Sequence, residues 1–281
     1  MSYKKRQHYL PQFYLKGFAT RTSLENNNPE VWLYIRNTAE KSHYYSWVNE
    51  KGEWDHTKDS ELSELENSVA PLIKKIDRNV IKLIKHQTSE SQIDQLETVD
   101  ASEISGLLHF VVSMMTRVPA VIDKMSENVE EGLGFIFGDN LYEKDSNLTK
   151  QSVIPSALSI GAGLSKENDF HKIFLSREIS VAYVPDFNAS LITSDNPVWR
   201  WRREGDDGIK YEDTEINLPL TQHCQLLITG KNKGKPLSYF KIHDKQAIEG
   251  INSYIAHNSK AFIVGRDKLL LNRIAKSQEW C

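Results

Sequence analysis

The chain has 281 residues, 39% of them hydrophobic, which suffices for one large domain or two small ones with a sizeable core. A formal charge of −3 argues against a uniformly basic nucleic-acid-binding protein, although local basic patches remain open. The two cysteines, Cys224 and Cys281, match neither a disulfide framework nor a four-ligand zinc site, so we expect a reducing, cytoplasmic location.

Residues 1–60 are predicted to form an N-terminal arm of loops and short strands. Residues 30–37, EVWLYIRN, have the composition of a strand, and residues 43–48, HYYSWV, predict a second one with a hairpin return through Trp54. No apolar run follows the basic residues 4–6, so we expect no signal peptide. The longest apolar run, residues 107–115, is shorter than the roughly 20 residues that span a bilayer, and no membrane association is expected.

Residues 60–175 are predicted to be mainly helical. From Ser60 onward, apolar residues recur at the three- and four-residue steps of an amphipathic helix, and Pro71 predicts a kink in it. The stripe consists of Leu62, Leu65, Val69, Leu72 and Ile76. Residues 100–137 predict one long helix or two joined near Pro119, with Asp100 or Ser102 as the N-cap. Residues 139–165 predict a loop with a short helix.

From residue 176 the pattern changes to strands at 179–186, 190–196, 216–229 and 261–267, with a late helix at 243–259. Strands and helices are thus segregated along the chain, which predicts an α+β fold with a mainly antiparallel C-terminal sheet. We expect a single composite domain over residues 1–281, made of the arm (1–60), a helical part (60–175) and a sheet part (176–270).

The common catalytic and nucleotide-binding signatures are missing from the sequence. There is no GxGxxG and no GxxxxGK[ST], so no motif supports a nucleotide cofactor. GxSxG, HExxH and CxxC are missing as well. Any reaction therefore has to be sought in residues scattered along the chain.

Small polar residues follow the predicted strand at 190–196, in the run Ser194-Asp195-Asn196-Pro197. Such residues commonly form turns, because Asp and Asn side chains bond to the local backbone. Alternatively, the strand end presents the Asp195 carboxylate to a cleft, where Asp195 and Asn196 would offer the oxygen ligands that Mg²⁺ or Mn²⁺ prefers. Both interpretations stay open at this point.

Arg117 and Glu66 also allow two interpretations each. Arg117 lies at the end of the apolar helix pattern, where the helix dipole favours a cation; in a cleft, its guanidinium would suit phosphate or carboxylate. Glu66 lies near the edge of the buried stripe, where a solvated helix face is the default interpretation.

Two further runs combine residue types that bind ligands. Residues 199–203, WRWRR, could stack bases and neutralise phosphates, but a half-buried edge strand with its arginines in solvent explains them equally well. His223 and Cys224 are neighbours on a predicted strand and would point to opposite faces, so structural roles are favoured over a shared metal.

His8 begins an aromatic-rich run, HYLPQFYLKGF (8–18), with ample apolar surface to dock on a core. Together with VWLYIR, LENSVAPLI, TRVP, LITSDNP, NLPLT and INSYIAHNSKAFIV, this run resembles the microbial family catalogued as "domain of unknown function 4238", over nearly the whole chain. The resemblance implies no established activity. By this resemblance the marked positions are His8, Pro11, Leu15, Phe18, Glu66, Arg117, Ser194, Asp195 and Pro197.

If folding brings His8, Glu66, Arg117 and Asp195 together, they would suit phosphodiester hydrolysis. We therefore predict a metal-assisted phosphodiesterase or nuclease. His8 would be the general base, Arg117 would bind the scissile phosphate, and Glu66 and Asp195 would hold Mg²⁺ or Mn²⁺. The predicted contacts to a nucleic-acid substrate are Lys5, Arg6, Ser194, Asn196 and Arg200.

Two alternatives use the same residues without catalysis. The protein could be a nucleic-acid or ligand-binding module that uses its basic arm and the WRWRR run. It could also be a structural or interaction protein, in which a buried His/Glu/Arg/Asp network fixes the N-terminal segment onto the helices. One open pocket shared by these residues would favour catalysis, whereas a sealed interior would favour the network.

Overall fold

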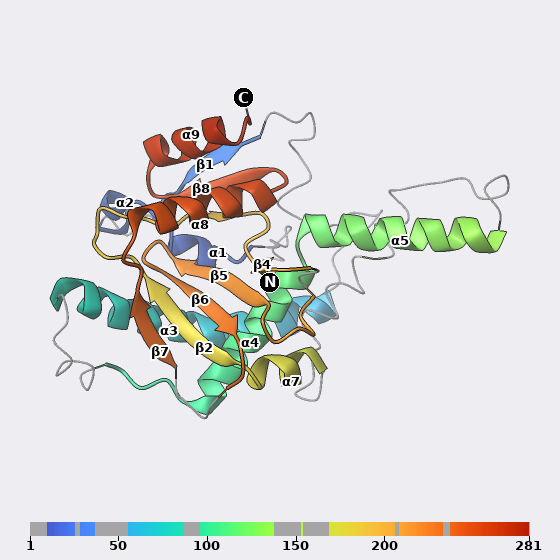
Figure 1. Ribbon diagram of the computed structural model, residues 1–281, viewed down its shortest axis with the longest axis horizontal. Helices are drawn as coiled ribbons and strands as arrows, with labels where there is room; N and C mark the ends of the chain where they lie inside the picture. The colour runs from blue at the N-terminus through green and yellow to red at the C-terminus, as the bar shows by residue number, and fades with distance from the viewer. Residues whose placement is uncertain are drawn as a thin grey trace.

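The computed structural model has the predicted α+β architecture, with a central run of helices followed by a C-terminal part that holds most of the strands (Figure 1). It describes residues 10–25, 29–36, 56–86, 96–137, 153, 169–205, 208–232 and 237–280. Several sequence-based expectations fall outside these residues: His8, Lys5 and Arg6, the strand at 43–48 with its hairpin, and nearly all of the loop at 139–165.

The larger sheet has five strands in the order β4-β5-β6-β2-β7, antiparallel except for the parallel pair β2–β7. Their bounds are β2 (Glu178–Tyr183), β4 (Trp199–Trp201), β5 (Glu215–Thr221), β6 (Cys224–Thr229) and β7 (Ser238–Lys241). The prediction of one strand over 216–229 was wrong, because β5 and β6 form a hairpin that turns at Gln222 and His223. The register shifts next to Pro219, a residue that cannot donate to the strand ladder.

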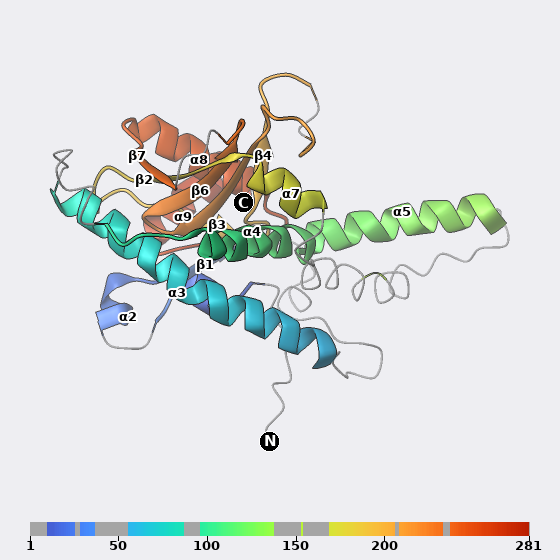
Figure 2. The same ribbon diagram turned by 90° about the horizontal axis from the view of Figure 1, so that it is seen from below.

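Two helices, α3 (His56–His86) and α4 (Ala101–Thr116), lie side by side on one face of this sheet (Figure 2). The predicted stripe of α3 is confirmed, since Val69, Leu72 and Ile76 are at most 2% exposed. Asp100 caps α4 in a capping box, as predicted for this position. After a break, α4 is followed by α5 (Pro119–Phe137), so residues 100–137 form two helices joined near Pro119.

The smaller sheet has the order β1-β8-β3 and is antiparallel. Its strands are β1 (Trp32–Ile35), β3 (Thr193–Ser194) and β8 (Phe262–Gly265), and the helices α8 (Lys245–Asn258) and α9 (Lys268–Ser277) lie beside it (Figure 1). Successive residues of β8 alternate between two cores: Phe262 and Val264 join the main core, and Ile263 joins the core under α8 and α9. This small sheet therefore links the two hydrophobic clusters.

Two short helices, α1 (Gln12–Lys16) and α2 (Arg21–Glu25), lie where loops and short strands were predicted, and a third, α7 (Asp169–Leu175), ends the predicted helical part. The first of them is fixed by Tyr14, which is completely buried. The Tyr14 hydroxyl donates to the carbonyl of Pro219 at 2.8 Å and lies 2.7 Å from Thr193 Oγ1. Because that carbonyl can only accept, the Thr193 hydroxyl donates to Tyr14. One side chain thus ties α1 to both sheets.

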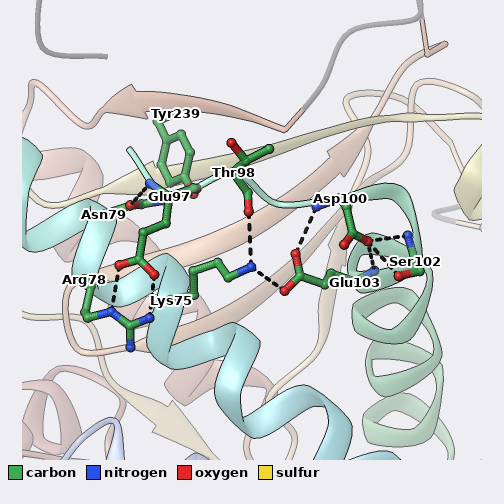
Figure 3. A network of polar contacts seen from close by, with 9 residues as sticks. All are labelled: Lys75, Arg78, Asn79, Glu97, Thr98, Asp100, Ser102, Glu103 and Tyr239. Atoms are coloured by element: carbon green, nitrogen blue, oxygen red, sulfur yellow. Dashed lines mark hydrogen bonds and ion pairs between the residues drawn. The ribbon is translucent and has the colours of Figure 1, made fainter. Parts of the chain in front are cut away.

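A polar network fastens the segment before α4 to α3 (Figure 3). Asn79 is fully buried; its Nδ2 donates to the carbonyl of Glu97 at 2.9 Å and to the Tyr239 hydroxyl at 3.1 Å, and its Oδ1 accepts from the Glu97 N–H at 2.8 Å. On the surface, Arg78 forms two hydrogen bonds to the Glu97 carboxylate, and Lys75 pairs with Glu103. Asn79 is therefore the buried centre of the network, and the ion pairs form its rim.

We expect Asn79→Ala to lower the free energy of unfolding by about 2 kcal/mol, because it leaves buried backbone and hydroxyl groups without partners. The exposed Arg78→Ala should change it little, since solvent screens that ion pair. Urea unfolding of both variants measures the difference. An equal loss in the two variants would contradict the assignment of Asn79 as the centre of the network.

Candidate functional site

Two of the predicted site residues, Glu66 and Arg117, form an ion pair between α3 and the end of α4. Arg117 Nη1 donates to Glu66 Oε1 at 2.8 Å, and Nη2 contacts Met114 Sδ at 3.0 Å. The Arg117 side chain is 1% exposed, and burial lowers its pKa, whereas Glu66 acts to raise it. Its Nε has no hydrogen-bond partner among the described residues. The guanidinium is thus enclosed in the packing of α3 against α4.

Asp195 follows β3, at the predicted strand end, and is also 1% exposed. Its Oδ1 accepts hydrogen bonds from Ser259 Oγ at 2.6 Å and from the Lys260 N–H at 3.1 Å, and its Oδ2 accepts from the Ala261 N–H at 2.7 Å. Burial raises the pKa of this carboxyl, and these hydrogen bonds oppose the shift. Asp195 therefore fixes the turn between α8 and β8.

The neighbours of Asp195 make local contacts as well. The Asn196 N–H donates to Ser194 Oγ at 3.2 Å, and Asn196 Nδ2 donates to the Asn258 carbonyl at 3.1 Å. Arg200 lies half-buried on the edge strand β4. The structure thus brings Glu66 and Arg117 together and places Asp195 in a separate set of contacts, while Lys5, Arg6 and His8 lie outside the described residues.

A cavity of about 300 Å³ lies at the turn of the β5–β6 hairpin. Residues of α2 and α3, the hairpin turn, the loop after β2 and the end of β8 come together around it. Its lining consists of Leu24, Ile81, Lys85, Phe187, Gln222, His223 and Arg266. None of these residues was among the predicted site residues.

His223 of this cavity is paired with Asp77 of α3. Its Nδ1 lies 3.1 Å from Asp77 Oδ1, which also accepts from the Thr221 hydroxyl at 2.6 Å. An ionised carboxylate only accepts hydrogen bonds, so the Nδ1–H of His223 donates to Asp77. The Phe187 ring packs edge-on against the imidazole, with centroids 5.7 Å apart. Asp77 therefore orients His223 as general bases are oriented in enzymes.

Two cations flank this pair. Lys85 is exposed near the end of α3, two turns beyond Asp77 on the same helix face. Arg266 Nη2 donates to the carbonyls of Phe187 and Ala189, and burial lowers its pKa. A base and two positive charges around one cavity suit an anionic ligand such as a phosphate ester.

A protein-family model described as "Protein of unknown function (DUF4238)" matches residues 6–269. The chain belongs to this family. No curated protein and no solved structure matches it.

In this DUF4238 protein, His223 was missed because it was placed on a continuous strand with Cys224. The hairpin instead leaves His223 in the turn and buries Cys224, and this burial raises the pKa of the Cys224 thiol. The two side chains therefore lie in different surroundings: His223 lines the cavity, and Cys224 lies in the hydrophobic core. The sequence signal that could have found the cavity is the spacing of Asp77, Ile81 and Lys85, which places a carboxylate and an amine on one face of α3.

Two general findings concern the described part of this DUF4238 protein. No group of three or more His, Cys, Asp or Glu side chains there could hold a metal ion, and Mg²⁺ or Mn²⁺ at Glu66 and Asp195 stays a prediction. Within the same residues, no single helix is long and apolar enough to cross a membrane, and one bent pair, α4 with the start of α5, meets that test jointly.

We expect Asp195→Asn to lower the free energy of unfolding by about 2–3 kcal/mol, because an amide cannot accept all the hydrogen bonds of the turn. The same change at Asp244, the N-cap of α8, should have little effect, since Asn caps helices equally well. Thermal and urea unfolding of both variants test this. Unchanged stability of Asp195→Asn would contradict a role in the turn and favour the predicted metal site.

Proposed function

We propose that this DUF4238 protein binds a phosphoester in the cavity at His223 and hydrolyses it, with His223 as the general base. The observation that supports this most directly is the Asp77–His223 pair, whose histidine lines a cavity together with Lys85 and Arg266. Nucleic acid is the substrate that the sequence predicted, and its phosphodiester linkages fit this chemistry.

The proposed reaction is an attack of water on phosphorus. His223 Nε2 takes a proton from the water as its oxygen bonds to phosphorus, and Asp77 stabilises the imidazolium that forms. The ester P–O bond breaks, and its electron pair leaves on the alcohol oxygen, which then takes up a proton. Lys85 and Arg266 would neutralise the phosphoryl oxygens, where charge develops in the transition state.

The rim of the cavity is apolar, which favours an organic phosphoester over a bare phosphate ion. Leu24 is 42% exposed and Phe187 is 40% exposed, both at the cavity. An aromatic ring beside a cationic site offers a surface on which a nucleobase can stack. A nucleotide or a nucleic-acid strand end would therefore use both parts of the cavity.

For Glu66, Arg117 and Asp195, the contacts favour the alternative of a structural network. Arg117 and Asp195 are each 1% exposed and bonded to protein groups, so a substrate would have to displace these contacts to reach them. Their participation in catalysis, the divalent ion and the basic arm remain predictions that the same assay can test.

We expect purified protein to cleave labelled RNA, labelled DNA or bis-p-nitrophenyl phosphate, and His223→Gln to lower kcat by about 10²- to 10⁴-fold. Lys85→Ala should mainly raise KM, because it removes a charge that binds the phosphate. Each substrate is tested with Mg²⁺, with Mn²⁺ and with EDTA. The EDTA reaction also tests the predicted metal requirement.

The matched control is His257→Gln, which removes an exposed histidine of α8 and should leave kcat unchanged. Asp77→Asn keeps an acceptor for Thr221 but removes the charge that orients His223, so it should lose activity and remain folded. Cleavage of equal rate in wild type and His223→Gln would reject the proposed base. Loss of cleavage in Asp195→Ala alone would restore the site predicted from the sequence.

A further inference from the structure

A second cavity of about 300 Å³ meets the cavity at the hairpin turn, and Arg266 lines both of them. It lies between the first halves of α8 and α9 and the loop after β2. The Arg266 guanidinium donates to the carbonyl of Phe187, which lines the cavity at the turn. It also donates, at 3.1 Å, to the carbonyl of Ala189, which lines the second cavity. This arginine therefore lies where the two cavities come together.

One wall of the second cavity is fixed by Asn252 of α8, which is 1% exposed. Its Nδ2 donates to the Ser190 carbonyl at 2.9 Å, and its Oδ1 accepts from the Ile192 N–H at 3.0 Å. These buried hydrogen bonds hold α8 against the loop after β2. The wall therefore exists without a ligand, as is usual for ligand sites.

Cations extend from the cavity at the turn into the second one. Lys85 and Arg266 line the first cavity, and the second one adds Lys245 and Arg273. Lys245 and Arg273 are both exposed, so their charged groups can reach a ligand. A guanidinium has five N–H donors, and the two carbonyls bonded to Arg266 use at most two of them. A ligand with a single phosphate would use only part of this set.

Two carboxylates, Asp267 and Glu249, also line the second cavity. Asp267 Oδ1 accepts from the N–H groups of Leu269 and Leu270 and thereby caps α9. Glu249 lies 3.9 Å from Arg273, and both side chains are at least half exposed, so solvent screens this pair. Three cations thus face two carboxylates, and a phosphate can compete with Glu249 for Arg273.

Apolar side chains lie beside these charges. Leu269 is 77% exposed and lines the second cavity together with Ile248 and Leu270. Such a surface can contact the face of a nucleobase, while the cations bind its phosphate. Each cavity is at the lower end of the size range of ligand sites, which is about 300–1,000 Å³. Each would therefore hold one small group, and a larger substrate would occupy both.

We infer that the second cavity is the subsite for a second nucleotide, and that the substrate is a single-stranded nucleic acid instead of a mononucleotide. This inference rests on the proposed binding of a phosphoester at His223. Arg266 binds the phosphate that links the two nucleotides, and Lys245 and Arg273 bind the next phosphate along the strand. Leu269 contacts the second base. Each cavity takes one base, so the strand is unpaired where it binds.

The test measures Kd by calorimetry for AMP and for the 5′-phosphorylated di- and triadenylates, in ribose and deoxyribose form. Phosphorothioate linkages keep the charge and resist hydrolysis. We expect wild type to bind the triadenylate at least about 10-fold more tightly than AMP, because the second contact forms within one complex. In Lys245→Ala/Arg273→Ala this gain should disappear, whereas the Kd of AMP should not change. The slope of log Kd against log salt should become shallower by about 0.7 for each cation removed.

The matched control is Lys231→Ala/Lys276→Ala, which removes two exposed lysines that line neither cavity and should keep the gain. Glu249→Gln removes an opposing charge and should bind the triadenylate more tightly, a result that misfolding cannot produce. Equal affinity of wild type for AMP and the triadenylates would overturn the inference and leave the proposed function standing. So would a gain that survives in Lys245→Ala/Arg273→Ala. If no nucleotide binds to wild type, the proposed function fails, and the inference fails with it.

Discussion

The turn of the β5–β6 hairpin is the point on which the arrangement of the cavity depends, because separate parts of the chain hold it. The Gly17 carbonyl accepts from the Gln222 N–H, the Leu191 N–H donates to the Gln222 carbonyl, and Asp77 bonds to the His223 ring. A Cβ on Gly17 would lie 3.1 Å from a carbonyl oxygen of β5. Only glycine lets α1 approach this closely without displacing the strand. The aromatic N-terminal run therefore helps to position the hairpin turn, in addition to contributing its own buried side chains to the core.

Buried polar contacts elsewhere join elements that are distant in sequence. Arg117 connects α4 to α3 through Glu66, Asp195 closes the turn before β8, and Tyr14 links α1 to both sheets. Each contact satisfies groups that would be costly to bury alone. The contacts of Glu66, Arg117 and Asp195 lie within the packing of the fold, and none of these three residues lines the cavity that holds His223.

The sequence was informative wherever local physics decides the structure. The apolar spacing of α3, the Asp100 cap, the break before Pro119 and the strand at β1 all follow from periodicity and local hydrogen bonding. The hairpin turn at Gln222 was not predicted from the sequence, because the apolar residues on both sides of it are typical of one continuous strand. Likewise, α1 has only five residues and depends on tertiary contacts such as those of Tyr14, which no local pattern contains.

The candidate site was hidden for the same reason, although half of it lies on one helix. The spacing of Asp77, Ile81 and Lys85 on α3 is visible in the sequence, but it resembles any amphipathic boundary with charges at its edge. It becomes a site only when the hairpin turn brings His223 against Asp77 and the end of β8 brings Arg266. His223 is positioned by its contact with Asp77 across 146 residues of sequence, and Arg266 by its contacts with the carbonyls of Phe187 and Ala189 across 79 and 77 residues. The ring of a histidine in a turn is oriented by the carboxylate to which it bonds. In this fold, the hydrophobic packing of α3 against the larger sheet positions that carboxylate.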